Sequence, residues 1–201
     1  MLADLPNRLS QSLAGVGNLA VYAWTRDLDG VLTNANDQQV FYSKWSNGAW
    51  TPPTQFTTDT AGNRNARVSV GSDGRTYLVW QSATNLMLSQ DFSAPPTLVR
   101  ADSQTAGFAD YAMTIGPGGN LALLWQEMSQ AGSDAHYRVL DPASATWGKD
   151  AQLFEDAPLE RSFAPVWDDV GNLTVAYNKV QILHTNLTVA IDGGDVRTWA
   201  R

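Results

Sequence analysis

The chain has 201 residues and a mass of 21.8 kDa, which suits one large domain or two small ones. Apolar residues make up 43% of it, enough for a core, whereas charged residues make up 16%, against roughly 25% in an average globular chain. The absence of cysteine excludes disulfide scaffolds, zinc fingers and thiol enzymes; three Glu and three Lys argue against a helical bundle, and 10% aromatic residues argue against a disordered chain.

The charge balance argues against two kinds of partner. The net charge is −7, and the acidic residues, mostly Asp, are scattered along the chain. Nucleic acids and anionic membranes need a basic stripe, and the longest basic feature is Arg64 with Arg67, so neither is expected as a partner. The sequence contains no run of about 18 apolar residues, so no membrane span is predicted. The composition favours a bacterial secreted or cell-surface protein, although residues 1–6 lack the features of a signal peptide.

A hairpin with a glycine turn repeats along the chain. Segments that read as strand, tight turn and strand lie at 12–24, 69–80, 114–125 and 166–177. The turn glycines are Gly17, Gly74, Gly119 and Gly171, spaced 57, 45 and 52 residues apart. An aromatic residue follows each glycine by six or seven positions. Glycine supplies the positive φ that short hairpins require. The apolar runs 121–125 and 173–177 are typical of strands covered on both faces.

Two further strand motifs follow each hairpin. A third strand is predicted at 40–44, 86–90 and 137–140. An outer strand is predicted where an aromatic residue, a polar or proline turn and an apolar residue succeed one another, at 50–56, 92–98 and 147–153. Proline cannot donate to a strand ladder, so this strand belongs at an edge. Each unit therefore holds four short strands, and the approximate units are 9–57, 65–100, 109–154 and 162–201.

Four-stranded units at this spacing predict an all-β fold. They are typical of a β-propeller, here of about four antiparallel four-stranded blades. Two stacked sandwiches are the alternative. The blades form either a small closed ring or an arc of a larger propeller, and an open arc would expose apolar blade faces and form a homodimer.

One set of motifs resembles a known family. The motifs are Gly119-Asn-Leu-Ala-Leu-Leu-Trp125, Tyr42-Ser-Lys44 and the Gly-x-Trp-x-x-Pro pattern at 48–53. Together they resemble the sialidase-like propeller repeats of bacterial extracellular proteins, which are related to Asp-box (BNR) repeats. The family pattern is Ser-x-Asp-x-Gly-x-Thr-Trp; residues 43–50 lack its Asp and Thr, and residues 72–77 are compressed. The box is a structural turn in that family, so the resemblance implies a fold rather than catalysis.

The C-terminal unit departs from the pattern. By the spacing of the third unit, the outer strand of the fourth should begin at Trp199, and the sequence ends at Arg201. We expect either a fragment of a longer protein or a last blade completed by residues 2–10. Alternatively, residues 184–195 begin a separate strand pair, with a turn at Asp192-Gly-Gly-Asp195.

A long loop at 25–39 offers oxygen ligands of the kind that calcium prefers. They belong to Asp27, Asp29, Asn34, Asn36 and Asp37. Their spacing matches no known calcium loop, so a solvated insertion loop is the favoured interpretation, and no metal or cofactor is assigned.

The requirements of a sialidase-like enzyme are only partly met. The family uses three arginines, a Tyr and Glu pair and an Asp, and glycosidases generally need two carboxylates facing one bond. The chain offers Arg26, Arg64, Arg67, Arg75, Arg100, Arg138, Arg161 and Arg197 with Glu127, Glu155 and Glu160, but no Arg-Ile-Pro motif. Arg64, Arg67 and Arg161 lie between units and could face a central site, although surface or inter-blade ion pairs are favoured. No catalytic residue is assigned.

The histidines and tryptophans complete the candidates. His136 and His184 are the only histidines, and His136 is interpreted as a lone polar residue of a strand. Gly116-Pro-Gly-Gly119 is interpreted as a hairpin turn, because a strand follows it. The tryptophans at repeat positions are interpreted as inter-blade packing: Trp24, Trp80, Trp125, Trp50 and Trp147. Trp45 and Trp167 lie outside the pattern and are candidates for stacking on a sugar ring.

Three functions remain open. The favoured one is a non-catalytic secreted or surface propeller module that binds protein or glycan through residues not yet known. A sialidase-like or other glycoside-acting enzyme fragment and a purely structural repeat module are the alternatives, since a fold does not decide function.

Overall fold

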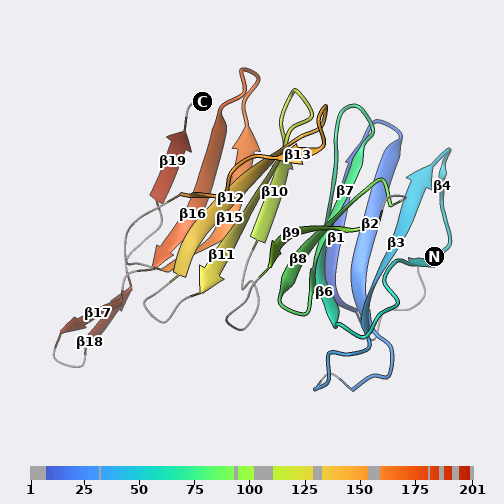
Figure 1. Cartoon of the computed structure of the whole chain (residues 1–201), viewed down its shortest axis with the longest axis horizontal. Helices are drawn as coiled ribbons and strands as arrows, with labels where there is room; N and C mark the ends of the chain where they lie inside the picture. Colours follow the sequence, from blue (N-terminus) through green and yellow to red (C-terminus); the bar gives the residue numbers. More distant parts are fainter. Residues whose placement is uncertain are drawn as a thin grey trace. The chain divides into compact units, whose positions relative to one another are not determined.

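The computed structural model describes residues 8–31, 33–92, 95–101, 111–128, 133–153, 159–180, 182–185, 188–191 and 195–199. Within these residues all regular secondary structure is β, as predicted, and the strands pair antiparallel (Figure 1). The chain divides into two compact units, Met1–Gly107 (unit 1) and Phe108–Arg201 (unit 2). Among the described residues there is no helix of the length and hydropathy that crossing a membrane requires.

The first sheet of unit 1 follows the predicted order of strands. It contains β1 (Arg8–Val16), β2 (Leu19–Asp27), β3 (Gln38–Ser46), β4 (Ala49–Trp50) and β5 (Thr54–Gln55). Both β4 and β5 pair with β3, so the predicted outer strand is split in two. Pro52 and Pro53 lie at the split, because neither has an N–H to donate to the ladder.

The second sheet of unit 1 contains β6 (Asn63–Val70), β7 (Thr76–Ser82), β8 (Asn85–Gln90) and β9 (Thr97–Ala101), paired in that order. The first strand has a bulge between Arg64 and Arg67, where Asn65 takes a positive φ of 56°. A corresponding bulge recurs in unit 2, where Ser162 takes a φ of 59°. The first strands of these two sheets therefore share a kink as well as a turn.

The first sheet of unit 2 repeats the layout of the first sheet of unit 1. Its strands are β10 (Tyr111–Ile115), β11 (Leu121–Met128), β12 (Ser133–Asp141), β13 (Thr146–Trp147) and β14 (Ala151–Gln152). Here too the two short outer strands both pair with the third strand, β12. Residues 148–150 lie at the split and contain no proline, so proline is one cause of the split outer strand but not a necessary one.

The last sheet corrects one expectation about the C-terminal unit. It contains β15 (Leu159–Trp167), β16 (Leu173–Val180) and β19 (Asp195–Trp199), and Trp199 pairs with Leu173. Trp199 therefore lies on the third strand and does not begin the outer one. The extra length is a separate hairpin of β17 (Ile182–Thr185) and β18 (Thr188–Ile191), as the alternative predicted. Thr185 pairs with Thr188 in this hairpin, and most of the predicted turn at 192–195 lies outside the described residues.

The N-terminal segment corrects the expectation that residues 2–10 complete the last blade. Arg8 pairs with Arg26 and Ser10 with Thr25, so residues 8–10 begin β1 of the first sheet. They therefore form the first strand of the first sheet instead of an outer strand of the last one. Residues 2–7 lie outside the described part of the chain.

The turn glycines behave as predicted. All four take a positive φ, of 55° at Gly17, 83° at Gly74, 80° at Gly119 and 90° at Gly171. In the last three turns the glycine N–H donates to a carbonyl three residues earlier, at 2.9 to 3.2 Å. The segment 116–119 is accordingly a hairpin turn between β10 and β11.

Each unit has an apolar core between its two larger sheets. The repeated tryptophans are buried, with exposures of 2% at Trp24, 2% at Trp80 and 0% at Trp125, and Trp80 belongs to the core of unit 1, as predicted for packing between sheets. The run 121–125 is buried on both faces as predicted. The run 173–177 is not: Leu173, Val175 and Tyr177 are buried, whereas Thr174 and Ala176 between them are half-buried.

Candidate functional site

Three turns of unit 1 line an open groove. The groove has a volume of about 450 Å³ and is lined by residues 16–19, 46–47 and 72–74, which belong to the β1–β2, β3–β4 and β6–β7 turns. We call it the turn groove. Its polar side chains are Asn18, Ser46, Asn47, Ser72 and Asp73. Amides, hydroxyls and a carboxylate offer both donors and acceptors to a ligand rich in hydroxyl groups.

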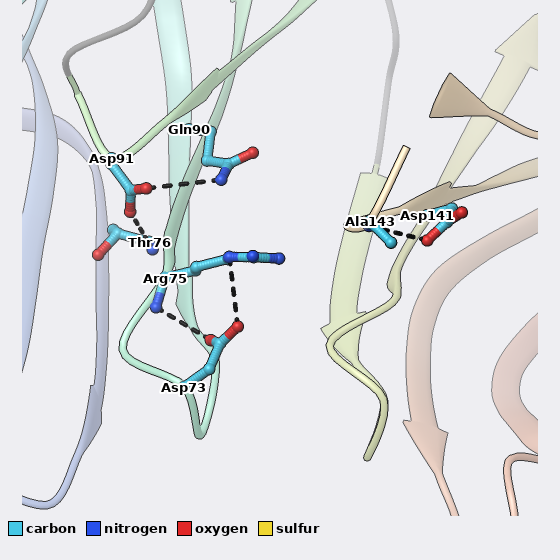
Figure 2. A network of polar contacts seen from close by, with 7 residues as sticks. All are labelled: Asp73, Arg75, Thr76, Gln90, Asp91, Asp141 and Ala143. Atoms are coloured by element: carbon cyan, nitrogen blue, oxygen red, sulfur yellow. Dashed lines mark hydrogen bonds and ion pairs between the residues drawn. The ribbon is translucent and has the colours of Figure 1, made fainter. Parts of the chain in front are cut away.

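A carboxylate holds one of these turns in place. Figure 2 shows Asp73 accepting a hydrogen bond from the Arg75 backbone N–H at 3.0 Å and pairing with Arg75 Nε at 3.4 Å. The next residue, Thr76, begins β7, and its backbone N–H donates to the Asp91 carboxylate at 2.8 Å. The expected surface ion pair is therefore confirmed for Arg75, and its partner lines the turn groove.

Two tryptophans lie on the hairpin that also supplies Ser46 and Asn47. Trp45 on β3 pairs with Trp50 on β4, and their ring centroids are 5.7 Å apart at 58°. Trp45 is half-buried, whereas Trp50 is 38% exposed. The prediction that Trp50 packs between blades is wrong, because β4 is the two-residue outermost strand of its sheet. Trp45, a predicted sugar-stacking candidate, gains a second ring beside it.

A second groove in unit 2 uses matching positions. It has a volume of about 450 Å³ and is lined by Asn120, Val139, Asp141, Thr146, Trp147 and Gly148. Asn120 follows the turn glycine as Asn18 does in unit 1. Asp141 accepts from the Ala143 N–H at 2.9 Å (Figure 2) and from the Ser144 hydroxyl at 2.8 Å. These bonds, that of Ala143 foremost, lower the pKa of Asp141, so the groove carries a negative charge.

The tryptophan of the second groove is partly covered. The Arg138 guanidinium lies 5.5 Å from the centroid of the Trp147 ring, and Arg138 Nε donates to the Gly148 carbonyl at 3.0 Å. Trp147 is half-buried, so its expected role in inter-blade packing gives way to a cation–π contact at the rim of a groove. Trp50 is therefore the more accessible platform of the two.

A histidine of unit 2 sits between two carboxylates. His136 Nδ1 lies 2.8 Å from Asp150 Oδ1, and His136 Nε2 lies 3.9 Å from Glu127 Oε2. The Trp125 ring stacks on the imidazole at 6.0 Å, and its Nε1 donates to Glu127 Oε1 at 2.9 Å. His136 is thus not the lone strand residue that we predicted. Its register opposite Trp125 on β11 places it there, and this register is decided by strand pairing.

The imidazole engages both carboxylates of this cluster. Asp150 lies at Nδ1 of the ring and Glu127 at Nε2. One ligand atom each of Glu127, His136 and Asp150 lies within 4.8 Å of the other two, so these residues could also hold a cation. Hydrolysis of a glycosidic bond would require both carboxylates to face the bond instead of the ring.

The long loop of unit 1 brings three of its five predicted ligands together. Carboxylate oxygens of Asp27, Asp29 and Asp37 lie within 4.8 Å of one another. Asn34 Nδ2 donates to Asp29 Oδ2 at 3.0 Å, and Asn36 is exposed. The Val31 backbone N–H, which donates to Asp29 Oδ1 at 2.7 Å, is the main cause of a lowered pKa of Asp29. Among the described residues, these carboxylates and the His136 cluster are the two sets that could hold a cation.

The remaining candidates do not converge in the described residues. Arg64 and Arg67 lie on either side of the β6 bulge, Arg64 half-buried and Arg67 exposed. Outside the described side chains lie Arg161, Arg197, Glu155, Glu160 and His184. Trp167 is no sugar platform, because its ring lies 3.0 Å from where a Cβ on Gly116 would be and packs against the core of unit 2.

The sequence matches no family model and no curated protein. The backbone is similar to a protein of unknown function from Dyadobacter fermentans, with a TM-score of 0.65 and 12% identity over 86% of this chain and 62% of that one. It is also similar to an endo-arabinase from Bacteroides thetaiotaomicron, with a TM-score of 0.56 and 12% identity over 98% of this chain and 76% of that one. A third similar structure is an α-L-arabinofuranosidase from Podospora anserina in complex with cellotriose, with a TM-score of 0.54 and 11% identity over 96% of this chain and 63% of that one.

These likenesses show the class of fold. The chain has the all-β architecture of β-propeller proteins, with sheets of antiparallel strands repeated along the sequence. The likeness does not single out the sialidase-like or Asp-box repeats. The chain spans 62% of the length of the Dyadobacter protein.

Proposed function

We propose that the chain is a non-catalytic β-propeller module of a secreted or cell-surface protein and that it binds glycan in the turn groove. The observation that carries this proposal is the turn groove, two of whose polar residues, Ser46 and Asn47, lie on the same hairpin as the 38% exposed Trp50. We further propose that the four sheets are four blades, either closed as a small ring or open as an arc.

The chemistry of the groove supports a sugar more than other small ligands. An aromatic ring offers an apolar face for the C–H groups of a pyranose or furanose, and the neighbouring amides and hydroxyls serve its hydroxyl groups. Asn18, Asn47 and Ser72 supply such groups without a positive charge in the lining. A second groove in unit 2 with Asn120 and Trp147 supports a repeated site.

The structural neighbours support the same ligand class. An endo-arabinase and an arabinofuranosidase with cellotriose both handle carbohydrate, and a polysaccharide lyase that acts on ulvan has a TM-score of 0.57 at 10% identity. Because similar folds carry unrelated activities, the neighbours favour the glycan class and name no particular sugar. A protein ligand remains the alternative partner for the same surface.

The test is a glycan array with the whole chain, followed by calorimetric titration with the oligosaccharides that bind. We expect Trp50→Ala to weaken binding at least tenfold, since stacking is lost. Leu98→Ala is the matched control, because Leu98 is a 52% exposed apolar side chain on β9, outside the groove lining. A chain that folds normally and binds no glycan would contradict the proposal and favour a protein ligand or a purely structural module.

An enzymatic function has one observation in its favour, the two carboxylates around His136. We expect no release of reducing ends or unsaturated products from arabinan, cello-oligosaccharides or ulvan, because both carboxylates contact the His136 ring. If wild type releases product and Glu127→Gln abolishes it, the non-catalytic assignment is wrong.

A further inference from the structure

Two buried carboxylate oxygens in the long loop of unit 1 have no hydrogen-bond partner. Asp27 is 0% exposed; its Oδ1 accepts from the Gly30 N–H at 2.6 Å, and its Oδ2 accepts from no donor. Asp37 Oδ2 accepts from two backbone N–H groups, while its Oδ1 is buried and accepts from none. A buried carboxylate oxygen without a donor or a cation is costly, so these two atoms indicate a missing ligand of positive charge.

The geometry suits one cation shared by three carboxylates. The ligand oxygens of Asp27, Asp29 and Asp37 all lie within 4.8 Å of one another. Calcium binds oxygen at 2.3–2.6 Å, so two oxygens on one ion lie at most roughly 5 Å apart. The site therefore needs little rearrangement to place all three around one ion.

The loop holds these carboxylates in place through its own backbone. The N–H groups of Leu28 and Asp29 donate to Asp37 Oδ2 at 3.1 and 2.7 Å, which ties the end of the loop to its start. The loop also packs closely against the next turn of unit 1, because a Cβ on Gly62 would meet the Ala35 carbonyl oxygen at 2.7 Å. A supported loop loses little freedom when an ion binds, and this favours affinity.

We propose that Asp27, Asp29 and Asp37 bind one calcium ion, with Asp27 Oδ2 and Asp37 Oδ1 among its ligands and water completing the shell. Carboxylate oxygens alone favour calcium over zinc or copper, which prefer nitrogen or sulfur. Magnesium demands a near-ideal octahedron and keeps several waters, which a three-carboxylate loop serves less well. The ion would tie the end of β2 to the start of β3, and this replaces the solvated-loop interpretation.

The calcium site is remote from the turn groove. Leu19, at the start of β2, lines the groove, and Asp27 ends the same strand. At about 3.3 Å per residue, the two ends of this strand are roughly 26 Å apart. Calcium binding can therefore be measured without glycan, and failure of either proposal leaves the other intact.

The test uses the whole chain after treatment with a chelator and extensive dialysis. Calorimetric titration with CaCl₂ should show one site, and the Tm should rise by roughly 5–10 °C at a hundredfold excess over Kd. Asp27→Asn and Asp37→Asn should each weaken calcium binding at least tenfold. Asp168→Asn is the matched control, because the carboxylate of Asp168 also accepts backbone N–H bonds in an exposed turn but lies on another loop.

Two results would overturn the calcium site. One is a wild-type chain that shows neither heat nor a change in Tm with millimolar calcium. The other is an Asp37→Asn variant, folded by circular dichroism, that keeps the wild-type affinity. If Asp27→Asn does not fold, Asp29→Asn takes its place, because Asp29 is exposed and its replacement leaves the buried part of the loop intact.

Discussion

The buried side-chain amide of Asn63 connects three strands of unit 1. Its Oδ1 accepts from Trp80 Nε1 at 2.9 Å, and its Nδ2 donates to Asp59 Oδ1 at 2.8 Å and to Gln39 Oε1 at 3.3 Å. Trp80 is a repeated core tryptophan, so its packing role, predicted from the sequence, comes with a polar partner that the repeat did not reveal.

Replacement of Asn63 tests this network. Asn63→Ala leaves the buried Trp80 N–H without an acceptor, and we expect a loss of about 1–3 kcal/mol in the free energy of unfolding, measured with urea. Asn18→Ala, at an exposed turn, should change it by no more than about 0.5 kcal/mol. Equal effects of the two variants would show that the Trp80 bond contributes nothing.

The pH dependence of stability should reflect the turn carboxylate of Asp168. The Asn172 backbone N–H foremost, then the Asn172 side chain, lowers the pKa of Asp168 in the folded chain. A lowered folded pKa stabilises the protein above the unfolded value of roughly 4, and the contribution is lost as the pH falls through the folded pKa. Thermal melts between neutral and acidic pH should show a smaller fall in Tm for Asp168→Asn than for wild type. An equal fall would contradict this.

Among the elements, the hairpins are the ones that local chemistry specifies best. The turn glycines of positive φ and the apolar run after each could be predicted from the sequence, because both depend on residues nearby in the chain. The split of the outer strand into β4 and β5, and again into β13 and β14, was not readable, because it depends on which β3 or β12 residues remain free to pair.

The turn of the last sheet offers a clean test of backbone strain. Gly171 has a φ of 90°, and nothing lies within 4 Å of where its Cβ would be. Gly171→Ala should therefore cost about 1–2 kcal/mol through conformation alone. Gly118→Ala is the control, since Gly118 is not among the glycines of positive φ and has only Asn120 Nδ2, at 3.9 Å, near its Cβ position. Chemical denaturation measures both, and an equal cost would contradict the backbone argument.

At the scale of the whole molecule, the proposed blades imply an oligomeric state. A closed small ring covers every blade face and should sediment as a monomer, whereas an open arc leaves apolar faces that associate. We expect a monomer at micromolar concentration in analytical ultracentrifugation. A stable dimer would favour the open arc and a homodimeric module.

Much of this protein follows from local sequence. The strands, the turn glycines and the buried tryptophans depend on periodicity and on φ preferences, which act over a few residues, and so the all-β repeat was predictable. The exposure of Trp50, the carboxylates on either side of His136 and the place of Trp199 depend on which strands become neighbours. In the loop that follows Asp27, the side-chain oxygens could be recognised from the sequence as possible ligands. Their convergence and the burial of two of them arise only when β2 and β3 pair and bring the ends of the loop together.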